Sequence, residues 1–185
     1  MSIKSSDPLL FAGKIFALFY LGLTAMLTAA YLLSTVFYII FQVQELLDAP
    51  IESVDKIGFI FIALWFVMTF ASAISFYFFQ LLLRIIGTVG AGDPLTIENV
   101  TRLNRMGWIA LIFPIFPPSI LGIANHLVEE AAQRDVDLPL DWATAPWQNL
   151  ENGFFFSMLL ASVLFILARV FRNGAQMRED LDGTV

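Results

Sequence analysis

The sequence contains no cysteine and little charge. Only 14% of its 185 residues are charged, about half the share in soluble domains, while 58% are hydrophobic. The absence of cysteine excludes disulfides, thiolate metal sites and thiol nucleophiles. The net charge is −6 and no basic run occurs, which argues against direct nucleic-acid binding. A soluble domain of this size could not bury so much apolar surface, so the composition predicts a membrane protein.

The chain also lacks the residue groupings on which catalysis depends. It has no nucleophile–base pair and no phosphate-binding Gly-Lys-Ser/Thr motif. Its single histidine, His126, precedes Glu129 and Glu130, but this order is the reverse of the di-iron motif and has no second copy. We therefore predict no catalytic residue, no metal and no cofactor, and hence a protein that is not an enzyme.

Four apolar segments have about the 20 residues that a membrane-spanning helix needs. They cover residues 15–43, 57–83, 107–127 and 153–171, with a loop at 84–106 and a tail at 172–185. Apart from Arg169, which can snorkel outward, these spans contain no Asp, Glu, Lys or Arg. That absence argues against pumps, voltage sensors and proton-coupled transporters. We predict an all-α fold over residues 1–185, a single four-helix transmembrane bundle.

The basic residues gather on one side of this arrangement. Eight of the ten Lys and Arg lie in the N-terminal segment, the loop at 84–106 or the C-terminal region. Only Lys56 and Arg134 lie in the other two loops. The positive-inside rule then places both termini in the cytoplasm.

The polar groups inside the spans are small hydroxyls. In the first two spans they are Thr24, Thr28, Ser34, Thr35, Thr69, Ser72 and Ser75. Small and hydroxyl side chains let helices approach closely in lipid. We expect them at helix interfaces, the alternative being a hydroxyl-lined substrate path.

Three prolines interrupt the third span, Pro114, Pro117 and Pro118. Each removes a backbone donor and clashes with the preceding turn, so we predict a kink or a short unwound stretch. Two interpretations stay open: a structural kink, or a pocket or hinge. The second would suit a small permease or ligand-binding bundle.

The loop at 84–106 contains signals for a helix of its own. Gly-Asp-Pro at 92–94 favours a turn, Thr96 is placed to cap a helix, and Glu98 lies four residues before Arg102. Apolar residues fall on one side of that helix, at Val100, Leu103 and Met106. The pattern predicts an amphipathic cytoplasmic helix that leads into the third span.

The C-terminal tail is predicted to extend the fourth helix. One side of the extension forms an apolar line through Val170, Gly174, Met177 and Leu181. Arg102 and Arg105 of the inner loop would then face the tail acids Glu179, Asp180 and Asp182. The alternative is a helix that anchors at the lipid surface without such contacts.

These two segments also carry a resemblance. The run Gly92-Asp93-Pro94-Leu95-Thr96-Ile97-Glu98-Asn99-Val100-Thr101-Arg102-Leu103-Asn104-Arg105-Met106-Gly107 resembles a bacterial membrane family known as domain-of-unknown-function family 2975. The pattern of that family is approximately Gly-x-Pro-Phe-Thr-x-Glu-Asn-x-x-Arg-Leu-x-x-Ile-Gly, from which Leu95 and Met106 depart mildly. The tail from Val170 to Val185 is similar to the family's ending. The resemblance implies a four-span, multi-pass protein of the bacterial inner membrane.

Members of that family are often encoded beside small helix-turn-helix regulators. The resemblance therefore implies a regulatory or sensor protein that binds or sequesters a cytoplasmic helix-turn-helix protein. The candidate docking residues are Glu98, Asn99, Arg102, Arg105, Arg172, Arg178 and Glu179. Alternatives are the small permease above and an accessory or structural subunit that binds other membrane subunits, which the 19 Phe would suit.

Overall fold

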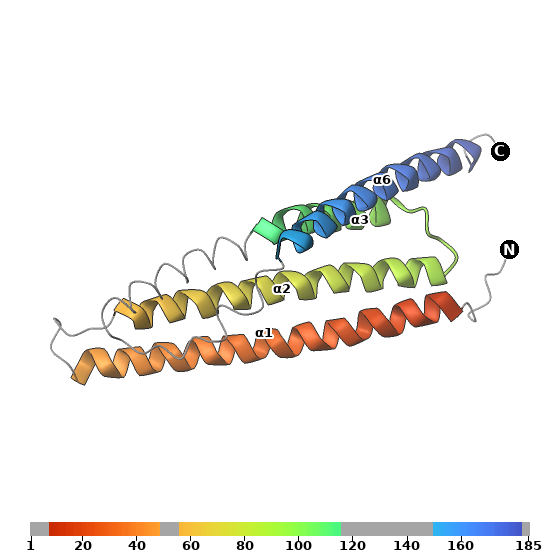
Figure 1. The fold of residues 1–185 in the computed structure, drawn as a ribbon. Helices are drawn as coiled ribbons and strands as arrows, with labels where there is room; N and C mark the ends of the chain where they lie inside the picture. Colours follow the sequence, from red (N-terminus) through yellow and green to blue (C-terminus); the bar gives the residue numbers. More distant parts are fainter. Residues whose placement is uncertain (1–7, 49–55, 116–149, 183–185) are drawn as a thin grey trace. The chain divides into compact units, whose positions relative to one another are not determined.

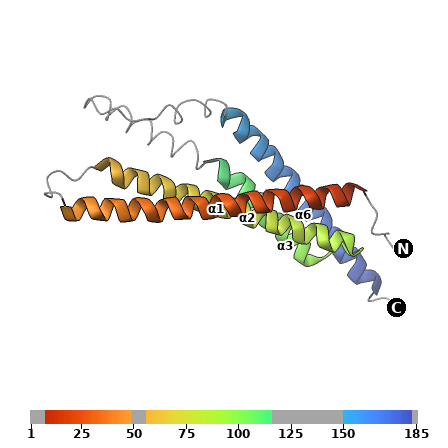
Figure 2. The same cartoon turned by 90° about the horizontal axis from the view of Figure 1, so that it is seen from below.

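The computed structural model describes residues 8–48, 56–115 and 150–182. Over these residues the regular structure is all helix, with no strand, as predicted (Figure 1 and, from below, Figure 2). The elements are α1 (Pro8–Asp48), α2 (Lys56–Gly90), α3 (Ile97–Ile112), the short 3₁₀ turn η2 (Phe113–Ile115) and α6 (Leu150–Asp182).

Three of these helices are long and apolar enough to cross a membrane, namely Pro8–Gln44, Trp65–Gly90 and Gly153–Leu181. They overlap the first, second and fourth spans predicted from the sequence. The helices are longer than those spans: α1 has 41 residues, about 60 Å of helix against a hydrocarbon core of about 30 Å.

The third predicted span, 107–127, lies only partly within the described residues. Helix α3 ends at Ile112, and η2 contains Pro114. Since proline cannot continue the α-helical hydrogen bonding, an end at this point agrees with the predicted break. Pro117 and Pro118 lie outside the described residues, so the crossing itself stays a prediction.

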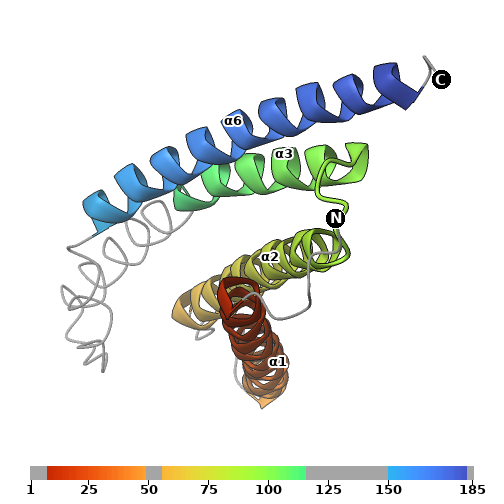
Figure 3. The ribbon, with the colours of Figure 1, turned by 90° about the vertical axis from the view of Figure 1, so that its right-hand side faces the viewer.

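The chain forms two compact units, each described here by itself. The first combines Met1–Leu18 with Phe78–Val185, and the second is Phe19–Tyr77. In the first unit α3 and α6 lie side by side (Figure 3). They run antiparallel, because Phe165 of α6 lies against Gly107 whereas Gly174, further along α6, lies against Leu95 before α3.

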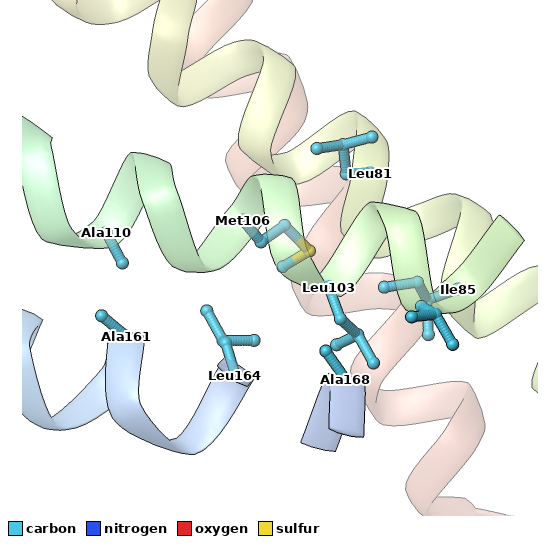
Figure 4. Close-up of a cluster of buried hydrophobic side chains, with 9 residues drawn as sticks. Leu81, Ile85, Leu103, Met106, Ala110, Ala161, Leu164 and Ala168 are labelled. Atoms are coloured by element: carbon cyan, nitrogen blue, oxygen red, sulfur yellow. The ribbon is translucent and has the colours of Figure 1, made fainter. Parts of the chain in front are cut away.

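The core of the first unit is formed by three helices. Figure 4 shows the side chains of α2, α3 and α6 converging on it. Its buried members are Leu81, Ile85, Val100, Leu103, Met106, Ala110, Ala161, Leu164 and Ala168. The predicted apolar side of the loop helix thus forms part of this core.

Three alanines and Leu164 form the buried side of α6. Ala161, Ala168 and Ala175 recur every seven residues and are each buried. This spacing matches the 3.5-residue repeat of packed helices, and small side chains allow close approach.

The apolar line predicted for the tail is not the buried side of α6. Val170, Met177 and Leu181 are 56%, 62% and 70% exposed. Gly174, the fourth member of the line, lies against Leu95. The buried side instead contains the three alanines and Leu164, because the small alanine side chains let α3 approach closely.

The second unit brings α1 against the first part of α2. The hydroxyl oxygens of Thr35 and Thr69 lie 3.5 Å apart. The ring of Trp65 lies 5.7 Å from that of Tyr31 and 6.1 Å from that of Tyr38, between centroids. These contacts confirm a helix interface for Thr35 and Thr69.

Candidate functional site

A glycine-dependent turn ends α2. Gly92 has φ +83°, a left-handed conformation that glycine adopts without strain. The N–H of Asp93 donates to the carbonyl of Thr88 at 3.1 Å, and the N–H of Gly92 donates to that of Val89 at 3.0 Å. This pair of bonds is the Schellman closure of a helix C-terminus. The predicted Gly-Asp-Pro turn is confirmed. It fixes the direction of the chain from α2 into α3.

Helix α3 begins with the predicted cap. Thr96 is the N-cap residue, and its hydroxyl accepts a hydrogen bond from the N–H of Asn99 at 3.2 Å. Glu98 lies in the first turn and forms a 3.0 Å ion pair with Arg102, four residues on. An acidic residue near the N-terminus and an i,i+4 pair both stabilise the helix start.

Asn99 connects these pieces into one buried hydrogen-bond network. Its side chain amide donates to the hydroxyl of Thr88 at 2.7 Å and to the carbonyl of Pro94 at 2.9 Å. Its carbonyl oxygen accepts from Arg102 at 2.8 Å, and the residue is 0% exposed. Both donors of the amide are thus used. We call Thr88, Pro94, Thr96, Asn99 and Arg102 the turn cluster.

The network continues into α2 through Thr88. Its hydroxyl accepts from Asn99 and donates to the carbonyl of Ile85 at 2.8 Å. A buried polar group left without a partner costs about 1–3 kcal/mol, so a fully bonded amide specifies one arrangement of its neighbours. The turn cluster therefore holds the end of α2, the connecting turn and the start of α3 in fixed positions.

The end of α6 closes over this turn. Arg178 donates to the carboxylate of Asp93 at 2.5 Å. A Cβ atom on Gly174 would lie 3.0 Å from the methyl groups of Leu95, so the two segments are in tight contact. Contact between the inner loop and the tail is thereby confirmed.

One of the predicted residues, Arg102, bonds elsewhere. Arg102, expected to face the tail acids, instead bonds to Glu98 and Asn99 within its own helix. The antiparallel register brings Arg178 level with the turn, so here the tail contributes the positive charge and the loop the negative one.

The candidate docking residues fall into two groups. Asn99 has no exposed surface, and the side chain of Arg102 is only 19% exposed, so both serve the turn cluster. The others are exposed at the surface of the first unit: Glu98, Arg105, Arg172, Arg178 and Glu179. Sequence reasoning missed Thr88 and Asp93, because no local pattern shows that a threonine eleven residues upstream will meet Asn99.

The described residues contain no group of three or more His, Cys, Asp or Glu that could hold a metal ion. His126 lies outside them. The turn cluster uses its hydrogen bonds internally, so the groups left for outside contact are the exposed charged side chains of α3 and α6.

One family model matches residues 45–185, and its description is "Protein of unknown function (DUF2975)". The match includes the whole turn cluster and all of α6. Neither the curated proteins nor the solved structures contain a match to the chain.

Proposed function

The chain belongs to the DUF2975 family, and on that premise we propose that it is a non-enzymatic membrane protein that binds a cytoplasmic helix-turn-helix regulator. The observation that carries this proposal is the turn cluster. It is a fully bonded scaffold built by three segments of the chain, and exposed charged side chains of both signs lie on α3 and on the end of α6. Recognition sites commonly lie on such loops held by a rigid scaffold.

The proposal includes a topology. The chain crosses the bacterial inner membrane four times, with residues 107–127 as the third crossing and both termini in the cytoplasm. Three apolar helices and the excess of basic residues near the termini and the α2–α3 loop support it. The first turns of α3 then form an amphipathic helix at the cytoplasmic surface, before the apolar run begins.

The docking surface consists of the exposed candidates Glu98, Arg105, Arg172, Arg178 and Glu179. Mixed charge at an interface selects partners by complementarity and speeds their association. Asn99 and Arg102 contribute by holding the surface in shape, because they are bonded within the turn cluster.

The test is co-purification with the helix-turn-helix protein encoded nearest to the chain. The full chain is extracted in mild detergent, and the regulator in the eluate is quantified by mass spectrometry. Reversing charge in Arg172→Glu with Glu179→Arg is expected to reduce recovery at least tenfold. Lys56→Glu, a charge reversal at the opposite end of α2, is the matched control and should leave recovery unchanged.

Two results would count against the proposal. Recovery of no regulator, with unchanged transcript levels after deletion of the chain, would refute it. A stable complex with the subunits of a membrane enzyme would instead support the role of an accessory subunit.

A further inference from the structure

Basic residues from several helices of the first unit lie at a similar height along the helix axes. We call this height the basic level. In the core, Ile85 of α2, Leu103 of α3 and Ala168 of α6 belong to one cluster (Figure 4). Arg84 directly precedes the first of these, and Arg169 directly follows the last. Neighbouring residues on a helix differ by only about 1.5 Å along its axis. Arg84 and Arg169 therefore lie at the height of this cluster.

The first helix adds a lysine to the same level. A Cβ atom on Gly13 would lie 3.9 Å from the side chain of Ile86, so α1 contacts α2 there. Lys14 is the next residue, and it is exposed. Arg172 lies one turn beyond Arg169 on α6 and is exposed as well. Three helices thus place a positive charge within about one turn of one another.

These charges are not neutralised within the described residues. No carboxylate there pairs with Lys14, Arg84, Arg169 or Arg172, since Glu98 and Asp93 are bonded to other arginines. The tail acid Glu179 lies seven residues beyond Arg172, about 10 Å along α6. The level therefore carries an excess of positive charge.

The surface of α6 changes character at this level. Between Phe154 and Leu167 its exposed side chains are apolar apart from Ser162, whereas Arg169 begins a charged stretch. Sixteen residues, about 24 Å of helix, separate Arg169 from Gly153, where the candidate span of α6 begins. Long basic side chains can snorkel outward, so a hydrocarbon core of about 30 Å leaves the basic level within reach of the headgroup region of one leaflet.

An exposed tryptophan marks the same boundary on α3. Trp108 is half exposed and packs edge-on against Phe165 of α6, with ring centroids 5.6 Å apart. Tryptophan is enriched at the boundary between the hydrocarbon core and the headgroups.

We propose that Lys14, Arg84, Arg169 and Arg172 form a belt that binds anionic phospholipids. The headgroup phosphates accept hydrogen bonds from the guanidinium and ammonium groups, while the acyl chains lie on the apolar surface of α6. This site goes beyond the proposed docking function and needs no protein partner. Each basic residue near an anionic surface is expected to change lipid affinity about fivefold.

The test measures which lipids stay bound to the full chain. The protein is released for native mass spectrometry from micelles containing equal amounts of phosphatidylglycerol and phosphatidylcholine with identical acyl chains. The wild type is expected to retain phosphatidylglycerol at least fivefold over phosphatidylcholine. A ratio near one would overturn the proposal, whatever the variants do.

Substitutions of the basic residues test whether the lipid binds at the belt. The triple variant Lys14→Gln, Arg84→Gln, Arg169→Gln should lower that ratio at least fivefold, while Arg84→Lys with Arg169→Lys should keep it. Lys56→Gln, which removes one positive charge about 42 Å from Arg84 along α2, is the control. An equal loss in the control would overturn the assignment to this belt.

Competition with inorganic phosphate distinguishes a lipid headgroup from a free phosphate ion as the ligand. If millimolar inorganic phosphate abolishes the lipid preference, the level is a site for the free anion, and the lipid belt is refuted. An unchanged preference supports the belt.

Discussion

Asn99 of the first unit and the threonine pair Thr35 and Thr69 of the second unit bond their polar groups differently. In the first unit, Asn99 joins α2, the turn and α3 through side chain hydrogen bonds. In the second unit, the hydroxyls of Thr35 and Thr69 donate to carbonyls of their own helices, at Tyr31 and Trp65. Between these two helices the hydroxyls approach each other only at 3.5 Å.

This difference shows where the chain specifies geometry. A hydroxyl that bonds within its own helix is satisfied whatever the neighbouring helix does, so it places little constraint on packing. A buried amide that needs partners from three segments is satisfied in one arrangement only. We therefore expect substitution of Asn99 to be costly and substitution of Thr35 or Thr69 to be mild.

The largest effect is expected for Asn99→Leu. Leucine branches at Cγ as asparagine does, but its side chain is larger and has no polar atoms. The change leaves the carbonyl of Pro94 and one N–H group of Arg102 without their buried partner. At about 1–3 kcal/mol for each such group, we expect a loss of about 3 kcal/mol in stability. Thermal unfolding in detergent, followed by circular dichroism, measures it. A stability equal to that of the wild type would show that the turn cluster does not hold the first unit.

The second-largest loss of stability is expected at Gly107, where α3 and α6 approach closely. A Cβ atom on Gly107 would lie 2.7 Å from the ring of Phe165, so Gly107→Ala should cost about 1–3 kcal/mol by overpacking. Gly87→Ala is the matched control, because no atom lies within 4 Å of its added Cβ. Adding Phe165→Leu to Gly107→Ala should restore part of the loss. Equal unfolding temperatures for the two glycine variants would contradict the packing described here.

The local parts of this site were predictable from the sequence. Gly92 at the turn, Thr96 at the cap and Glu98 paired with Arg102 follow rules that depend on neighbours within four residues. The three candidate membrane helices follow from composition in the same way.

The contacts between segments were not predictable in this way. Arg178 and Asp93 are 85 residues apart, and their pairing depends on the register of α6 against α3. That register is set by Ala161, Ala168 and Ala175, whose small size matters only once a neighbouring helix is known. An alanine has too little apolar surface to mark a buried side by itself, so the sequence does not indicate which side of α6 packs against α3.

A smaller effect is expected at the contact between the tail and the turn. The pair of Arg178 and Asp93 is about half exposed, and such ion pairs contribute about 0.2–1 kcal/mol. A double-mutant cycle with Arg178→Gln and Asp93→Asn should give a coupling energy in that range, and it should shrink at high salt. Zero coupling at low salt would mean that Leu95 and Gly174 alone hold the tail.

The smallest effect is expected in the second unit, at Thr35 and Thr69. Replacing either residue by valine keeps its shape and removes a hydroxyl that bonds mainly to its own helix. Hydrogen bonds between membrane helices average about 0.6 kcal/mol, and a 3.5 Å contact belongs at or below that value. The double variant should therefore unfold within a few degrees of the wild type. A coupling energy as large as the loss in Asn99→Leu would erase the difference between the units, because the second unit would then also be fixed by a specific polar contact.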